Sequence, residues 1–179
     1  MTRARLEELE REFRSYRRTA ERAMEQADDA AFFQVLDTES NSVAILAQHM
    51  AGNLRSRFTD FLTSDGEKPD RHRDQEFEMT PGTSRADLMA RWAAGWQILG
   101  EATAPLSDAD LDRTVLIRGE PHTVHRALLR SLAHMALHTG QIIQLAKHWA
   151  GPAWVTLSIP RGQSEAYRPP GRPADRPTA

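Results

Sequence analysis

The stretch that decides the fold, residues 123–149, reads TVHRALLRSLAHMALHTGQIIQLAKHW. Steps of three and four residues place one set of its side chains on a single helical face. That face comprises Ala127, Ser131, His134, His138, Gln141 and Leu145. Gly151 is well placed to end the helix. We therefore expect one long helix from near Thr123 to about Trp149, with two histidines on its inward face.

The two histidines of this face, His134 and His138, have the spacing of a helical metal-binding pair. Residues four apart on a helix have Cβ atoms about 5–6 Å apart, so both rings can reach one ion at Zn–N distances of about 2.0–2.1 Å. The same spacing also occurs in hydrogen-bonded core histidines, so both interpretations stay open. A metal site would need a third ligand.

His49 is the one other histidine placed in the middle of an amphipathic helix. Residues 38–42 are rich in capping residues, and the apolar stripe that follows them includes Val43, Leu46 and Leu54. In a helical bundle His49 can lie at the height of the other two histidines, which makes a three-histidine site geometrically reasonable. The alternative is a core histidine beside Met50.

The remaining chain supplies two more helices and their connections. A heptad-like stripe from Leu6 predicts the first helix, and Ser84 with Asp87 forms a capping box that starts another, which Pro105 ends. Residues 64–83 have the composition of a long surface connection rather than a packed element. The β-branched run at residues 113–119 predicts an extended segment or small hairpin before the last helix.

The sequence thus predicts an all-α fold in one domain, residues 1–160, followed by a proline- and arginine-rich tail at residues 161–179. We expect the tail to form an extended strap. No stretch of the sequence has the apolar core of a signal peptide or the roughly 20 apolar residues that span a bilayer. These features predict a soluble, cytoplasmic protein that does not bind a membrane.

Composition limits the chemistry further. A net charge of −2 leaves no excess of positive charge for phosphate backbones, so nucleic acid is not expected as a partner. The chain has no cysteine, so it supplies neither a thiol nucleophile nor thiolate ligands. Any metal must therefore be held by imidazole, carboxylate or carbonyl groups.

Three segments resemble the DinB/YfiT-like superfamily, in a branch of uncharacterised bacterial proteins. They read NSVAILAQHMAGNLRSRFTDFLTSDGEKPDRHRDQEF, IRGEPHTVHRALLRSLAHMALHTGQIIQLAKHW and LSIPRGQSEAY. The resemblance implies a four-helix bundle with long crossover connections, often a homodimer. It also implies a divalent metal held by three histidines, which correspond to His49, His134 and His138 here.

The resemblance further implies a metal-dependent enzyme that acts on a small-molecule substrate. Its reaction would be S-transfer with a low-molecular-weight thiol such as bacillithiol, or hydrolysis. Zinc or nickel is expected, and iron also suits three imidazoles. The alternative is a non-catalytic metal-binding or dimeric stress-response module. An open coordination position beside a pocket favours the enzyme, and a fourth protein ligand such as Gln141 favours the module.

Three residues near the histidines are candidates for supporting roles: Asn53, Gln141 and Arg130. The two amides could orient the ligands or be ordinary interior amides. Arg130, with Arg55 and Arg57, could hold an anionic substrate or form ordinary salt bridges. The tryptophans at 92 and 96 are expected in the core, or one of them above the metal.

Overall fold

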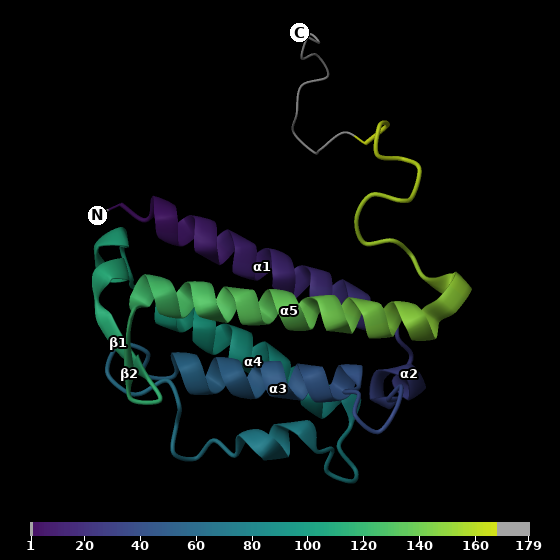
Figure 1. Cartoon of the computed structure of the whole chain (residues 1–179), viewed down its shortest axis with the longest axis horizontal. Coiled ribbons are helices and arrows are strands. Elements are labelled where there is room, and N and C mark those ends of the chain that lie inside the picture. The colour runs from purple at the N-terminus through teal and green to yellow at the C-terminus, as the bar shows by residue number, and fades with distance from the viewer. Residues whose placement is uncertain (1, 168–179) are drawn as a thin grey trace, which may run out of the picture.

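The computed structural model describes residues 2–167 and is mainly helical in that part (Figure 1). Its α-helices are α1 (Ala4–Met24), α2 (Asp29–Phe33), α3 (Val43–Phe58), α4 (Arg85–Thr103) and α5 (Val124–Ala150). The short 3₁₀ helices are η1 (Arg73–Phe77), η2 (Asp108–Asp112) and η3 (Gly151–Ala153), and strands β1 (Thr114–Ile117) and β2 (Glu120–Thr123) form one hairpin. The expected all-α class agrees with this helical content, apart from the two strands.

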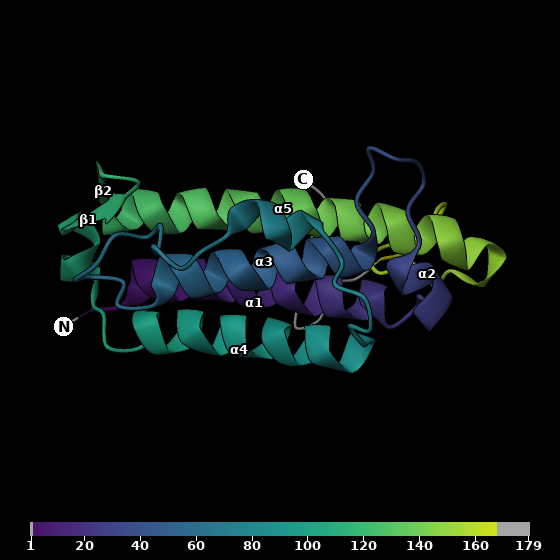
Figure 2. The same cartoon turned by 90° about the horizontal axis from the view of Figure 1, so that it is seen from below.

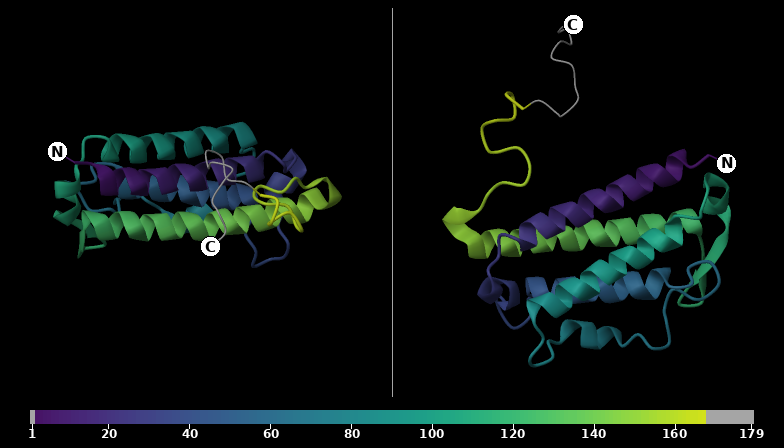
Figure 3. Two further views of the ribbon diagram at one scale, coloured as in Figure 1. Left: turned by 90° about the horizontal axis from the view of Figure 1, so that it is seen from above. Right: turned by 180° about the vertical axis from the view of Figure 1, so that it is seen from behind.

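The four long helices lie side by side (Figures 1 and 2). α3 packs mainly on α4, and α1 packs mainly on α5, while α3 and α5 also touch. The view from behind in Figure 3 shows α4 crossing in front of α3. Large side chains at the centre are fully buried, among them Trp92, Leu54, Met50, Leu128 and Met135. This apolar packing sets the distance between α3 and α5, where the histidines lie.

The helix starts follow the capping signals of the sequence. Ser42 accepts the N–H of Ile45 at the start of α3, and Thr123 accepts the N–H of Arg126 at the start of α5. The predicted capping box at the start of α4 is present. α3 ends at Phe58, because the chain turns at Asp60, which has a φ of 49°. The apolar pattern of the sequence continues to Phe61, beyond the end of the helix.

The predicted extended segment before the last helix is an antiparallel hairpin in which Ile117 faces Glu120. Its two turn residues have positive φ angles, 57° at Arg118 and 75° at Gly119, as in the type I′ turn that suits a two-residue hairpin. The carboxylate of Asp65 accepts both of their N–H groups, at 2.8 and 2.7 Å. The hairpin is thus fastened to the connection that follows α3.

The connection at residues 64–83 is a surface segment, as predicted, but part of it packs against α3. It runs along the outer side of α3 (Figure 1) and contains η1. The side chain of Arg71 is only 2% exposed. Composition was misleading here because its buried polar groups pair with one another, which removes the usual cost of burying them.

Beyond α5 the chain returns to the end of α1. Gln26 exchanges two hydrogen bonds with the backbone of Val155, and Arg22 donates to the carbonyl of Leu157. The part of the predicted tail that the structure describes, residues 161–167, is exposed. Residues 168–179 lie outside the described part, so the strap and the boundary at residue 160 stay predictions. No helix in residues 2–167 combines the length and apolarity needed to cross a bilayer.

Candidate metal centre

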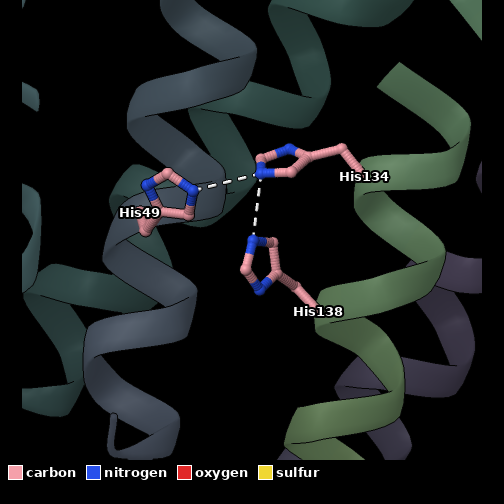
Figure 4. A group of neighbouring side chains, drawn as sticks. All are labelled: His49, His134 and His138. Carbon is pink, nitrogen blue, oxygen red and sulfur yellow. Dashed lines mark hydrogen bonds between the residues drawn. The ribbon is translucent and has the colours of Figure 1, made fainter. Parts of the chain in front are cut away.

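Two helices bring the three predicted histidines together. α3 carries His49 and α5, which runs in the opposite direction, carries His134 and His138 (Figures 1 and 4). The Nε2 atom of His134 lies 3.1 Å from Nε2 of His49 and 2.9 Å from Nε2 of His138. One ligand atom from each ring lies within 4.8 Å of the others, so the group can hold a metal ion.

The outer nitrogens of two of these rings have hydrogen-bond acceptors. Glu76 of η1 accepts from Nδ1 of His49 at 2.8 Å, and Gln141 accepts from Nδ1 of His138 at 2.6 Å. Arg71 holds Glu76 in place through two bonds of 2.8 Å. Metal-binding histidines commonly have such partners, which fix the orientation and tautomer of the ring. Nδ1 of His134 is buried and has no partner within residues 2–167.

Burial and repulsion from neighbouring charges disfavour a positive charge on the two histidine rings of α5. Burial, together with the neighbouring rings of His138 and His49, lowers the pKa of His134 to about 3. Burial also lowers the pKa of His138. Burial alone would raise the pKa of Glu76, but Arg71 and His49 reverse this and lower it. At neutral pH His134 and His138 are therefore neutral beside an ionised carboxylate, which are the protonation states that metal binding requires.

The three Nε2 atoms face one another, but the hydrogen-bond pattern leaves too few N–H donors among them to pair every lone pair. A carboxylate and an amide oxygen only accept, so Nδ1 carries the proton in both His49 and His138. When both of these rings are neutral, each of their Nε2 atoms presents a lone pair toward Nε2 of His134, which can donate a proton to only one of them. A cation at this point would satisfy all three. Tetrahedral zinc would place such nitrogens roughly 3.3 Å apart, close to the observed separations.

A pocket of about 230 Å³ lies beside two of the rings, His49 and His134. The other residues that line it are Asn53, Arg57, Arg71, Arg73, Arg118, Arg130 and Ser131. A further pocket, of about 390 Å³, lies on the α4 side of Glu76 and is lined by none of the three histidines. The smaller pocket is therefore the one that gives access to the candidate centre.

The candidate supporting residues divide between two places. Gln141 contacts the far nitrogen of His138, whereas Asn53 and Arg130 line the pocket without touching a ligand ring. Arg57 also lines this pocket, but Arg55 points elsewhere and pairs with Asp70 at 2.9 Å.

Both tryptophans named from the sequence lie in the core, and neither lines the pocket beside the histidines. Trp92 donates its indole N–H to Glu21, and Trp96 packs edge-on against Phe13.

Sequence reasoning missed the contribution of the connection after α3. Glu76 and Arg71 have no helical spacing relative to His49, so no periodicity links them to it. The one available signal was general: long connections in small domains are often functional. Gly52 leaves room for Glu76 beside α3, because a Cβ at this position would lie 2.3 Å from Oε1 of Glu76.

A family model matches residues 1–163, and its description reads "Protein of unknown function (DUF1572)". This family is DinB-like, in agreement with the broader part of the resemblance drawn from the sequence. No curated protein and no solved structure gives a significant match. Since the family model covers most of the chain, the protein belongs to the DUF1572 family of DinB-like proteins.

Proposed function

We propose that this protein is a metal-dependent enzyme that acts on a small molecule. His49, His134 and His138 would hold one divalent ion. The observation that carries the proposal is the convergence of three Nε2 atoms that share at most one proton when the rings are neutral. If His134 and His138 were only a hydrogen-bonded pair in the core, there would be no reason for the His49 ring to converge on the same point.

The arrangement supports an open site rather than a closed structural one. Gln141 and Glu76 contact Nδ1 atoms on the outer sides of their rings, so neither is oriented as a fourth ligand. Within the described residues the candidate ligand group consists of the three histidines alone. Three protein ligands with an accessible fourth position are typical of catalytic zinc sites.

The pocket favours thiol transfer over hydrolysis. Among the described residues no aspartate or glutamate lines it, so none of their carboxylates is placed there to take a proton from water. Its five guanidinium groups would instead favour the ionised form of an incoming thiol. Because the chain has no cysteine, that thiol must come from a cofactor such as bacillithiol. The ion would supply Lewis-acid activation, and zinc, nickel or iron suits the three imidazoles.

The chain's own residues have defined tasks in this proposal. Glu76 and Gln141 keep two ligand rings in the tautomer whose Nε2 is free. Arg71 keeps Glu76 ionised and in position. The apolar packing of α3 against α4 and of α1 against α5 holds the two ligand-bearing helices at a constant separation.

Elemental analysis of untagged protein tests the proposal. We expect about one divalent ion per chain, lost in each of the variants His49→Ala, His134→Ala and His138→Ala, with helicity retained. His148→Ala, an exposed histidine at the end of the same helix, is the matched control and should keep the metal. A metal-free wild-type protein that folds normally would refute the metal site.

A second measurement separates the two reactions. The metal-loaded protein is assayed for conjugation of bacillithiol to an electrophile and, in parallel, for hydrolysis of ester and amide substrates. Thiol conjugation that depends on the three histidines supports the transferase. Hydrolysis without thiol dependence would favour the hydrolase instead.

Sedimentation of the same sample tests the expected homodimer.

A further inference from the structure

The pocket beside the histidines gathers positive charge from four separate parts of the chain. Arg57 comes from α3, Arg71 and Arg73 from the connection after it, Arg118 from the hairpin turn and Arg130 from α5. Within the part of the chain that the structure describes, no acidic side chain lines the pocket. Arginines that repel one another do not converge on one small pocket without something to offset their charge.

Carboxylates behind the pocket offset only part of this charge. Glu67 contacts Arg57 at 2.9 Å, Arg118 at 3.1 Å and Arg71 at 3.5 Å. Glu76 accepts two hydrogen bonds of 2.8 Å from Arg71 and a third of 2.8 Å from His49. Three of the five guanidinium groups thus share these two carboxylates, which leaves an excess of positive charge at the pocket.

The remaining two arginines are weakly paired or unpaired. Arg73 contacts Asp74 at 3.5 Å, but that carboxylate is 98% exposed, and pairs of this kind contribute little. Arg130 makes no ion pair or hydrogen bond with any residue between 2 and 167. Asn53 and Ser131 are buried at the pocket wall and likewise have no side-chain partner among the described residues. The pocket wall thus has several hydrogen-bond donors without a protein partner among residues 2–167, and this indicates that the pocket binds a ligand.

The backbone at Arg118 supports the same conclusion. Its φ of 57° lies in the left-handed region, which residues with a Cβ rarely adopt, and asparagine or glycine would suit this turn better. Asp65 holds the turn by accepting the N–H groups of Arg118 and Gly119. An arginine in this unfavourable position is explained if its side chain is needed at the pocket.

We propose that this pocket binds an oxyanion group, carboxylate or phosphate, of the small-molecule substrate beside the three histidines. This inference rests on the proposed function, because the bound molecule is taken to be the enzyme's substrate. Guanidinium groups match carboxylate and phosphate through two parallel hydrogen bonds. At about 230 Å³ the pocket is smaller than most ligand sites, so it accepts a small anion or the anionic end of a larger molecule. Arg130, which has no partner among residues 2–167, is its main contact.

Calorimetric titration with inorganic phosphate and with succinate tests this proposal on metal-free and zinc-loaded protein. We expect saturable binding of at least one anion, weakened about tenfold or more in Arg130→Gln, since a charge-assisted hydrogen bond is lost. Arg130→Lys should fall between the two. Arg126→Gln is the matched control, because this exposed arginine lies one turn earlier on α5 and outside the pocket. Tighter binding of phosphate indicates a phosphate group on the substrate, and tighter binding of succinate indicates a carboxylate.

Metal analysis of each titrated sample separates this inference from the proposed function. Protein that retains zinc but binds neither anion overturns the anion pocket and leaves the metal site standing. Equal weakening in Arg126→Gln and Arg130→Gln also overturns it, because the effect would then be one of net charge. Protein that takes up no zinc when zinc is supplied, yet binds an anion through Arg130, supports the pocket and refutes the metal-dependent enzyme.

Discussion

The helix pair α3 and α5 and the connection at residues 64–83 contribute to the same site in different ways. The helices supply all three candidate ligands, at spacings that a helix imposes. The connection supplies Glu76 and Arg71, which orient a ligand, and Glu67, which partly neutralises the arginines. The comparison teaches that potential ligands can be found by periodicity, whereas the groups that control them depend on how a loop folds back.

Among the substitutions that test this comparison, Glu76→Gln is expected to have the largest effect, which is a loss of metal affinity. The substitution removes the charge that holds His49 and leaves the buried Arg71 with a weaker partner. Loss of such an orienting group typically lowers metal affinity by about 10–100-fold. Competition with a chromogenic zinc chelator measures the change. Glu78→Gln, an exposed neighbour, is the control, and equal affinities in all three proteins would contradict the role of Glu76.

Gly52→Ala sharpens the comparison without changing any polar group. The added Cβ would lie 2.3 Å from Oε1 of Glu76, so that flexible carboxylate must move away from His49. Metal affinity should fall by up to about tenfold, while alanine favours the helical state of α3 by roughly 0.5–1 kcal/mol. Chelator competition and chemical denaturation measure the two effects.

Gly100→Ala in α4 is the control for this prediction, because a Cβ at Gly100 meets no atom within 4 Å. It should increase stability by a similar amount and leave metal affinity unchanged. An unchanged metal affinity in Gly52→Ala would show that the contact between Glu76 and His49 is not needed for binding.

Arg118→Asn separates stability from ligand binding in the hairpin. Asparagine tolerates the left-handed conformation, and the lost contact with Glu67 involves a side chain that is 55% exposed. We expect stability to rise by roughly 0.5 kcal/mol and binding of phosphate or succinate to weaken. Denaturant unfolding and calorimetry measure the pair of effects. A clear loss of stability would mean that the arginine serves the fold.

The smallest effect concerns the pH dependence of stability at Asp65. Burial alone would raise its pKa, but the N–H groups of Glu67, Gly119 and Arg118 outweigh burial and lower it. A lowered folded-state pKa stabilises the fold above the unfolded-state value of about 3.9, and this contribution is lost as the pH falls through the folded-state value.

Asp65→Asn should therefore lower the melting temperature at neutral pH, and the difference from wild type should shrink below about pH 4. Melting curves from neutral to acid pH measure this. A difference that stays constant over the whole range would contradict a charge-dependent role.

Much of the site was within reach of the sequence because helices repeat. His49, Asn53 and Arg57 are four residues apart and share one face of α3, and all three line the pocket. Arg55, two residues from Arg57, falls on another face and pairs with Asp70. Helical geometry therefore directs Arg55 and Arg57 to different surfaces, although the two arginines lie only two residues apart in the sequence.

Other parts could not be predicted, because they depend on contacts between segments that no local pattern links. The pairing of Glu76 with His49 spans 27 residues and requires η1 to fold onto α3. The position of Arg118 beside Arg130 depends on the hairpin being fastened by Asp65. Polar composition, read alone, made the connection look like an unpacked surface loop.

The sequence by itself determined the four long helices, the capping residues that start α3, α4 and α5, and the histidine face of α5, because hydrophobic periodicity and capping act over a few residues. Only the tertiary structure decided that His49 meets that face at hydrogen-bonding distance, which ring nitrogens are held by partners, and that five arginines surround one pocket. Those features depend on side chains that are far apart in the sequence. Their hydrogen bonds and ion pairs form only after the helices have packed.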